Sequence, residues 1–333
     1  MTATSARFVR SASALIVTGA LVGSLAACTG TFGSAACAPI VPTGETAGYV
    51  EASGRFGTLP EVSFPTPLTS DGTQQSVLIE GEGDPIAAGQ IVDFQVVLLN
   101  GVDGEIITAS AYDDEEAPLR RTAGSDIDVL AEVLQCAQVG SRTAITATMQ
   151  DVFDEETLEN IEGSLGLKAD NAIVMVVDVQ AAYLARATGI PQLGASGIPA
   201  VVTAPNGQPG VTIPNEEPPT DLRSHTLVLG QGATIEEGDR VVLHYTGLLW
   251  STKTVFDSSW ERDAPATFTI TSFENDPNGI VSGLADGLIG RTIGSQVIVV
   301  IPPEFGYPAG QAPASIPDGS TMVFVVDLLG IEG

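Results

Sequence analysis

The clearest strand in the chain reads Val242-Leu243-His244-Tyr245-Thr246-Gly247, and a second short run, Phe256-Asp257-Ser258-Ser259, follows it closely. Further runs rich in β-branched and aromatic residues lie at 267–270, 296–301 and 321–329, and they have the length of strands. Between them Leu284 and Leu288 stand four positions apart, on one face of a short helix. The pattern predicts an α+β fold in which an antiparallel sheet bends over a short α-helix.

The same order of features occurs earlier in the chain. Gly89-Gln90-Ile91-Val92 corresponds to Gly238-Asp239-Arg240-Val241, and the apolar run 173–179 corresponds to 322–328, with an offset of 149 positions at both ends. Two unrelated β-rich domains of similar composition would not share both the order and the spacing. The sequence therefore predicts two tandem copies of one domain.

The motifs of the second copy, together with Gly306-Tyr307 and Val323-Phe324, resemble those of the FKBP-type peptidyl-prolyl cis-trans isomerases. The resemblance covers the whole C-terminal domain, and its weight comes from the combination, since a lone Tyr-Thr-Gly means little. It implies that the sheet wraps the helix and leaves an apolar pocket that admits a proline side chain. Such a pocket works by stripping water from the imide and favouring its twisted state, and it needs no cofactor and no metal.

The resemblance also assigns site residues. The residues that match the catalytic pocket are Tyr245, Phe256, Asp257, Tyr307 and Phe324. The residues that match the substrate-binding positions are Ile280, Val281, Leu284 and Ile316. Tyr307 matches the tyrosine whose hydroxyl donates to a substrate carbonyl, and Ile280 resembles the residue whose backbone meets the ligand. Asp257 could orient Tyr245 or polarise the pocket.

The second copy departs from the family pattern at three places. Leu284 replaces the common tryptophan of the pocket floor, Ala266 replaces an aromatic residue, and Tyr307 is followed by Pro308. These changes put tight binding of macrolide inhibitors in doubt more than catalysis. Tyr245, Phe256 and Phe324 could also be plain core residues, but core packing does not explain the acid beside Phe256. His244 alternates with Tyr245 along the strand, so it should face away from the pocket.

The first copy lacks the polar pocket residues. At the same offset Tyr245 falls on Val96 and Phe324 falls on Met175, while the region around 108–111 has no Phe-Asp pair and the region around Phe153 has no tyrosine. We expect a degenerate domain of the same fold that has lost isomerase activity and serves in binding or as a spacer.

The N-terminus has the features of a lipoprotein signal. Arg7 and Arg10 precede an apolar stretch of about a dozen residues, too short for a membrane span, which ends in Leu25-Ala26-Ala27-Cys28. A small-residue cleavage site followed by cysteine resembles the lipobox of bacterial lipoproteins, in which that cysteine is lipidated; an ordinary secretion signal is the alternative. We expect Cys28 to anchor the protein to the outer face of the cell membrane.

Composition limits the remaining functions. With 41 acidic and 13 basic residues the net charge is -28, which repels phosphate backbones and argues against nucleic acid as a partner. Two histidines and three scattered cysteines fit no metal-ligand spacing, so no metal site is expected. Outside the cytoplasm Cys37 and Cys136 could pair, but the sequence leaves this open. It also leaves the oligomeric state open.

The chain is thus divided by sequence into a signal peptide (1–27), a lipidated cysteine with a flexible tether (28–47), a degenerate domain (48–185), a Pro-rich, semi-extended linker (186–222) and an isomerase domain (223–333). The expected function is isomerisation of X-Pro bonds in exported, proline-containing polypeptides. Two other interpretations stay open, a non-catalytic chaperone-like binding lipoprotein and a structural lipoprotein that uses the fold only as a scaffold.

Overall fold

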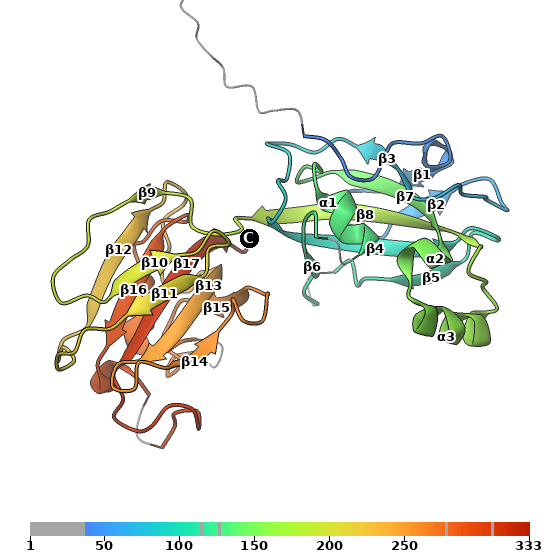
Figure 1. Ribbon diagram of the computed structural model, residues 1–333. Coiled ribbons are helices and arrows are strands. Elements are labelled where there is room, and N and C mark those ends of the chain that lie inside the picture. The colour runs from blue at the N-terminus through green and yellow to red at the C-terminus, as the bar shows by residue number, and fades with distance from the viewer. Residues whose placement is uncertain (1–36, 114–115, 126–127, 277–278, 308–309) are drawn as a thin grey trace, which may run out of the picture. The chain divides into compact units, whose positions relative to one another are not determined.

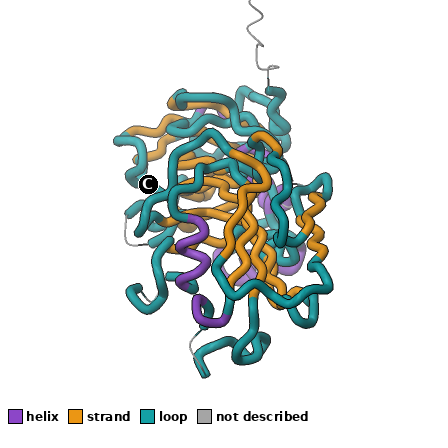
Figure 2. The backbone as a smooth tube through the Cα atoms, turned by 90° about the vertical axis from the view of Figure 1, so that its left-hand side faces the viewer, coloured by secondary structure: helices purple, strands orange, loops and turns teal. Residues whose placement is uncertain are grey.

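The computed structural model describes residues 37–113, 116–125, 128–276, 279–307 and 310–333. The predictions for residues 1–36, which include the signal peptide and Cys28, lie outside the described residues. The described chain forms two large antiparallel sheets with a few short helices, as Figures 1 and 2 show. The predicted α+β class with antiparallel sheets is confirmed. Among the described residues, no helix is long and apolar enough to span a membrane.

The C-terminal sheet contains the motifs that opened the sequence analysis. Its strands are β12 (Arg223–Leu229), β13 (Arg240–Leu249), β14 (Val255–Ser258), β15 (Ala266–Thr269), β16 (Gln296–Ile301) and β17 (Met322–Ile331). They are ordered β14-β13-β17-β16-β12, with β15 paired to β13 and the short strand β9 (Ile190–Pro191) at the edge beside β12. Helix α4 (Ser282–Leu288) and the 3-10 turn η2 (Pro303–Phe305) lie between strands.

The N-terminal sheet has the same strand order. Its strands are β3 (Gln74–Ile79), β4 (Ile91–Asn100), β5 (Ile106–Ala109), β6 (Leu119–Thr122), β7 (Arg142–Thr148) and β8 (Ala172–Tyr183). They are ordered β5-β4-β8-β7-β3, with β6 paired to β4. Helices α1 (Val129–Leu134), α2 (Met149–Val152) and α3 (Glu155–Leu165) complete this half, and Figure 1 shows α1 lying across the sheet.

The pairing register of the two sheets matches at the offset found in the sequence. Val96 pairs with Val177 in the first sheet, and Tyr245 pairs with Val326 in the second. The pairing of β4 with β8 has a β-bulge opposite Asp93 and Phe94, and the pairing of β13 with β17 has one opposite Val242 and Leu243; the extra residue lies in β8 and in β17. A bulge adds one residue and redirects the strand, so its repetition is a specific structural feature shared by both sheets.

The inner face of the C-terminal sheet packs against α4. Leu284 and Leu288 of this helix are 6% and 0% exposed, which confirms their predicted common face. Gly287 allows the helix to lie close to the sheet, because a Cβ atom there would come within 2.7 Å of the Val299 side chain. Burial of these leucines supplies the apolar contact that holds the helix in place.

The outer face of each sheet is covered by a β-hairpin that precedes it. Strands β1 (Glu51–Ser53) and β2 (Glu61–Ser63), which follow the turn η1 (Ala47–Tyr49), contribute Ala52 and Val62 to the outer core of the first sheet. Strands β10 (Ala200–Thr203) and β11 (Pro209–Thr212) contribute Val201 and Val211 to the outer core of the second. These hairpin residues also differ by 149 positions, so the duplicated pattern includes the hairpin.

This hairpin corrects the interpretation of residues 186–222 as a semi-extended linker. The range contains β9, β10 and β11, and its apolar residues pack on the second sheet. The prolines are compatible with this arrangement because they stand in loops, at strand ends or at an edge, where a missing N–H costs no ladder hydrogen bond. Pro209, for example, is the first residue of β11, in a two-stranded sheet.

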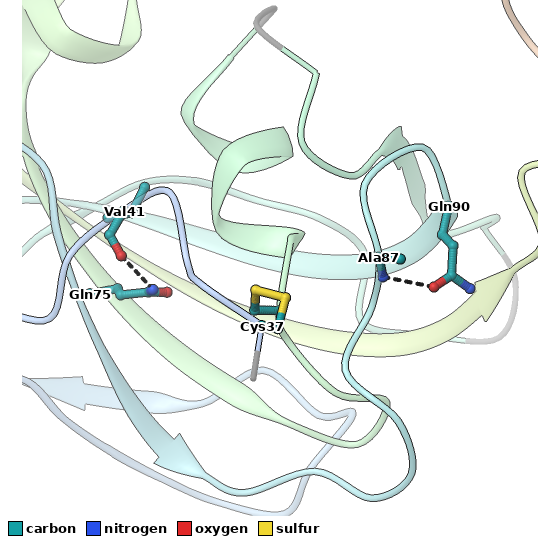
Figure 3. Close-up of a disulfide and its surroundings, with 6 residues drawn as sticks. Cys37, Val41, Gln75, Ala87 and Gln90 are labelled. Atoms are coloured by element: carbon teal, nitrogen blue, oxygen red, sulfur yellow. Dashed lines mark hydrogen bonds between the residues drawn. A yellow bond between two sulfur atoms is a disulfide. The ribbon is translucent and has the colours of Figure 1, made fainter. Parts of the chain in front are cut away.

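The second half of the predicted tether, 37–47, is also not a free segment. Cys37 forms a disulfide with Cys136, which lies just after α1, and Figure 3 shows this bond beside the hydrogen bond from Gln75 Nε2 to the carbonyl of Val41. Val41 is 2% exposed, and the backbone of residues 42–44 bonds to that of Gln75. The disulfide and these bonds fix the segment to the first domain, so the prediction of a flexible tether is wrong from Cys37 onward.

A buried ion pair distinguishes the outer face of the first sheet from that of the second. Arg142 and Asp178 have fully buried side chains and form a two-point salt bridge with N–O distances of 2.6 and 2.7 Å. Arg142 also donates to the carbonyls of Gly54 and Thr58 in the loop between β1 and β2. In the second sheet the same cross-strand positions hold Gln296 and Asp327. The ion pair therefore holds the first hairpin to its sheet.

We expect Arg142→Ala to lower the free energy of unfolding of the first domain by about 3–5 kcal/mol, because it leaves the Asp178 carboxylate buried without its cation. Urea unfolding followed by circular dichroism measures this change. The control is Arg121→Ala, whose pair with Asp128 has side chains 44% and 25% exposed and should contribute about 0–1 kcal/mol. Equal losses in the two variants would contradict the assignment.

Candidate functional site

A cavity of about 350 Å³ opens on the inner face of the C-terminal sheet, between the sheet, α4 and the loops around them. Its lining is mostly apolar and aromatic. It consists of Leu243, Tyr245, Phe256, Asp257, Phe268, Phe273, Gly279, Ile280, Val281, Leu284, Tyr307, Phe324 and Val326. A cavity of this size, with few polar groups, suits a compact apolar side chain.

The structure brings together eight of the nine pocket residues predicted from the sequence. Tyr245, Phe256, Asp257, Ile280, Val281, Leu284, Tyr307 and Phe324 all line the cavity. Ile316 does not line it; its side chain is 6% exposed and packs in the core cluster beneath the sheet. Leu284 comes from α4, the other apolar residues come from strands or the loops beside them, and Tyr307 follows η2.

The aromatic walls contact one another. The Phe256 ring meets Phe324 edge-on, with centroids 5.6 Å apart at 83°, and the Tyr245 ring lies 6.2 Å from Phe324. Phe268 lies 5.8 Å from Tyr245 and supplies an aromatic surface two residues beyond Ala266. Gly247 is required for this arrangement, because a Cβ atom there would come within 2.6 Å of the Phe256 ring. Offset and edge-on ring pairs of this kind hold the wall rigid.

A hydrogen-bonded trio of polar groups stands at the edge of the pocket. The Tyr245 hydroxyl donates to Oδ2 of Asp257, Arg262 Nη1 donates to Oδ1 of the same carboxylate, and Arg262 Nη2 lies 3.1 Å from the Tyr245 hydroxyl. Arg262 was missed from the sequence. A basic residue five positions after Asp257, in the loop that follows β14, is the signal that could have identified it.

Protonation of the trio follows from these contacts. Burial opposes ionisation of Asp257, but the hydrogen bonds from Tyr245 and Arg262 outweigh it and hold the pKa of the carboxyl below its ordinary value. Burial, and then the bond to Asp257, raise the pKa of Tyr245 to about 12. Burial, and then the charge of Asp257, also raise the pKa of Tyr307. Near neutral pH both tyrosines are therefore uncharged hydroxyl donors beside a carboxylate that carries its charge.

Ser259 of the Phe-Asp-Ser-Ser motif links the segment that follows β14 to β13 by hydrogen bonds. Ser259 Oγ accepts the N–H of Tyr245 at 2.8 Å and lies 2.9 Å from Nδ1 of His244. His244 stacks on Trp260 with ring centroids 4.0 Å apart and does not line the pocket, in keeping with its predicted direction. These bonds fix the backbone on which Tyr245 stands.

The resemblance suggested that the backbone of Ile280 meets the ligand, but a donor for the ligand needs an N–H that is not already bonded. The N–H of Ile280 already donates to the carbonyl of Thr271 at 2.9 Å, and its carbonyl accepts the N–H of Phe273. Among the hydrogen bonds formed between described residues, none uses the N–H of Val281, although Val281 is 3% exposed and lines the pocket. Val281 is therefore the better source of this donor.

The comparisons with known proteins place the chain in a family. Residues 231–329 match the family described as FKBP-type peptidyl-prolyl cis-trans isomerase. A "Probable FK506-binding protein" of Corynebacterium glutamicum is 34% identical over 124 residues, which are 37% of this chain and 97% of the relative. An "FK506-binding protein" of Streptomyces anulatus is 32% identical over 125 residues, with the same coverage of both chains.

A third relative is the "FKBP-type 22 kDa peptidyl-prolyl cis-trans isomerase" of Escherichia coli, 43% identical over 110 residues, which are 33% of this chain and 50% of the relative. The chain belongs to the FKBP-type peptidyl-prolyl cis-trans isomerase family, and the resemblance read from the sequence is confirmed. Among the described residues, no group of three or more His, Cys, Asp or Glu side chains could hold a metal ion.

His244 gives the domain a measurable pH dependence. Burial, only partly opposed by the Asp263 carboxylate, lowers the pKa of His244 from 6.5 to about 4. As the pH falls, His244 becomes protonated near pH 6.5 in the unfolded chain but only near pH 4 in the folded chain. We expect this group to lower the free energy of unfolding by about 3 kcal/mol as the pH falls across that window.

The measurement is the difference in unfolding free energy between the natural chain and His244→Phe, at several pH values. The variant keeps a ring against Trp260 but does not titrate. The comparison is needed because burial also raises the pKa of Asp327 to about 6. Protonation of Asp327 raises the free energy of unfolding as the pH falls, and this effect is the same in both proteins and cancels in the difference. A difference that stays constant from pH 7 to 4 would exclude a buried, neutral His244.

Proposed function

We propose that the pocket of the C-terminal domain catalyses rotation about X-Pro peptide bonds. The observation that carries the proposal is the aromatic cavity of about 350 Å³ with its uncharged tyrosine donors at the edge. The barrier to rotation is about 18–20 kcal/mol and comes from amide resonance, which the twisted imide has lost. An environment that favours the twisted state over the planar states accelerates the reaction without a covalent step.

In the proposed mechanism the proline ring enters the cavity against the Phe256 and Phe324 rings and rests on Leu284. Removal of water from the imide weakens the charge-separated planar form relative to the twisted form. The hydroxyl of Tyr307 and the N–H of Val281 donate to carbonyls of the substrate and hold it in a turn. Asp257, fixed by Arg262, orients Tyr245 and keeps the wall in place.

We expect Phe256→Ala to lower kcat/KM about tenfold or more, because it removes a wall that contacts the proline. Tyr307→Phe should lower it about threefold to tenfold through the loss of one donor. A protease-coupled assay on Leu-Pro and Phe-Pro peptides measures both. The controls are Phe56→Ala, a half-buried ring of the first domain, and Tyr49→Phe, whose exposed hydroxyl donates to Glu45.

The outcomes separate the candidate functions. A rate at the uncatalysed background in the natural chain would overturn catalysis and favour a module that only binds proline-containing segments. Unchanged rates in Phe256→Ala and Tyr307→Phe would remove the pocket assignment. The variant that combines Phe256→Ala and Tyr307→Phe also bears on the first domain, since a fall of its rate to the uncatalysed background would leave no turnover for that domain to explain.

We infer that the first sheet is a degenerate copy of the same domain. The common strand order, the common bulge and the equal pairing offset support this inference. At the positions of Phe256 and Asp257, strand β5 holds Ile107 and Thr108. The loop between β7 and β8 carries α2 and α3 in place of the Tyr307 segment, and its Phe153, Leu158 and Ile161 pack against the inner core. We propose that this copy acts in binding or spacing.

We further propose that the protein works outside the cytoplasm, anchored through lipid on Cys28 to the outer face of the cell membrane. The lipobox-like sequence and the disulfide between Cys37 and Cys136 support this location, because disulfides persist in oxidising compartments. The nine positions from Cys28 to Cys37 can span at most about 30 Å. The substrates would be exported polypeptides that contain proline.

We expect Cys28→Ser to move the protein from the membrane fraction to the soluble fraction, because two or three acyl chains are needed for stable anchoring. Immunoblots of fractionated cells, with mass spectrometry of the N-terminal peptide, measure the shift. The control is Cys37→Ser combined with Cys136→Ser, which removes the other two cysteines and should leave the protein on the membrane. Equal membrane association of all three forms would rule out this anchor.

A further inference from the structure

The loop that leads into the helix differs between the two copies. In the first sheet residues 123–128 join β6 to α1, whereas in the second sheet residues 270–281 join β15 to α4. The longer loop contains Phe273, which lines the pocket and has no counterpart in the shorter loop. This insertion lies beside the site, so it can change what the pocket accepts without changing the scaffold.

The insertion is closed at its base by hydrogen bonds. The N–H of Phe273 donates to the carbonyl of Ile280 at 2.8 Å, and the N–H of Ile280 donates to the carbonyl of Thr271 at 2.9 Å. Ser272 and Ile280 form an isolated parallel bridge. The backbone of Phe273 is thus fixed to the residue that adjoins Val281, the proposed backbone donor.

The ring of Phe273 stacks on Tyr307. Their centroids are 5.9 Å apart at 29°, and both side chains are half-buried at the cavity. The other ring contacts of the described pocket residues join Tyr245, Phe256, Phe268 and Phe324 to one another. The pocket therefore has two aromatic groups, the wall that we assign to the proline ring and a separate pair formed by Phe273 and Tyr307.

We propose that Phe273 is a specificity-determining residue that, with Tyr307, forms a subsite for the side chain of the residue before the proline. This inference rests on the proposed function, in which the Tyr307 hydroxyl donates to a substrate carbonyl next to the imide. The side chain of the residue before the proline follows this carbonyl in the chain, with its Cβ atom three bonds from the carbonyl carbon. It is therefore within reach of the paired rings, and an aromatic or large aliphatic side chain gains the contact.

Negative charge near the paired rings of Phe273 and Tyr307 disfavours an acidic side chain before the proline. The Asp257 carboxylate lines the pocket, and its charge acts on Tyr307. Glu274, the residue after Phe273, is exposed on the same loop. An acidic side chain before the proline would approach these carboxylates and lose its hydration water. It would therefore be rejected by repulsion, and it would also lack the favourable contact with the rings.

The test compares Phe-Pro, Ala-Pro and Glu-Pro peptides with the full-length chain and with Phe273→Ala, Phe273→Leu and Glu274→Ala. We expect Phe273→Ala to reduce the preference for Phe-Pro over Ala-Pro, measured as a ratio of kcat/KM, about threefold to tenfold. The loss of kcat/KM should be larger for the Phe-Pro peptide than for the Ala-Pro peptide. Phe273→Leu should restore part of the preference, and Glu274→Ala, the control in the same loop, should leave the Phe-Pro to Ala-Pro ratio unchanged.

The same peptides are also titrated against each protein by NMR to obtain Kd values, so the subsite is tested even if no turnover occurs. Absence of turnover in the natural chain would count against the proposed function only. An unchanged Phe-Pro to Ala-Pro ratio in Phe273→Ala, in both rate and Kd, would overturn the subsite. An equal loss on all peptides would also overturn it, because Phe273 would then be only a support for the loop.

Discussion

The two faces of each sheet must both be covered, and most of the structure follows from this constraint. Alternate residues of a strand point to opposite faces, so Phe324 and Val326 of β17 enter the inner core while Val323 and Val325 enter the outer core. A strand buried on both sides becomes an uninterrupted apolar run. The helix can cover only the inner face, and the preceding hairpin covers the other. The hairpin therefore belongs to the domain, and the inner face is left for the site.

The two copies use the inner face differently. In the second copy α4 and the aromatic rings leave a cavity, and the loop after β16 places Tyr307 at its edge. In the first copy the corresponding loop forms α2 and α3, whose apolar side chains pack against the inner core. The two sheets share their strand order and the hairpin that precedes each of them. The loops carry the differences that we assign to function.

The polar groups of the pocket support the walls and donate hydrogen bonds without titrating near neutral pH. Asp257 stays charged because Tyr245 and Arg262 donate to it, and the tyrosines stay neutral because they are buried beside that charge. This arrangement suits a reaction in which no proton is transferred and the main effect is desolvation of the imide. The loop of Phe273 reaches this arrangement through its contacts with Tyr307 and Ile280, and this is how it can tune selectivity.

Strand and helix patterns were enough to predict the α+β class, because they depend on local sequence. The family and eight of the nine pocket residues followed from the resemblance of the motifs of the second sheet to a known family. Four features became clear only in the tertiary structure: the hairpins over the outer faces, the disulfide of Cys37, the contact of Arg262 with Asp257, and the pairing of Phe273 with Tyr307. Each depends on where a loop lies in space, and local propensity carries no information on that. The prolines of 186–222 show the reason most directly, since their local preference favoured an open linker and burial against the second sheet decided otherwise.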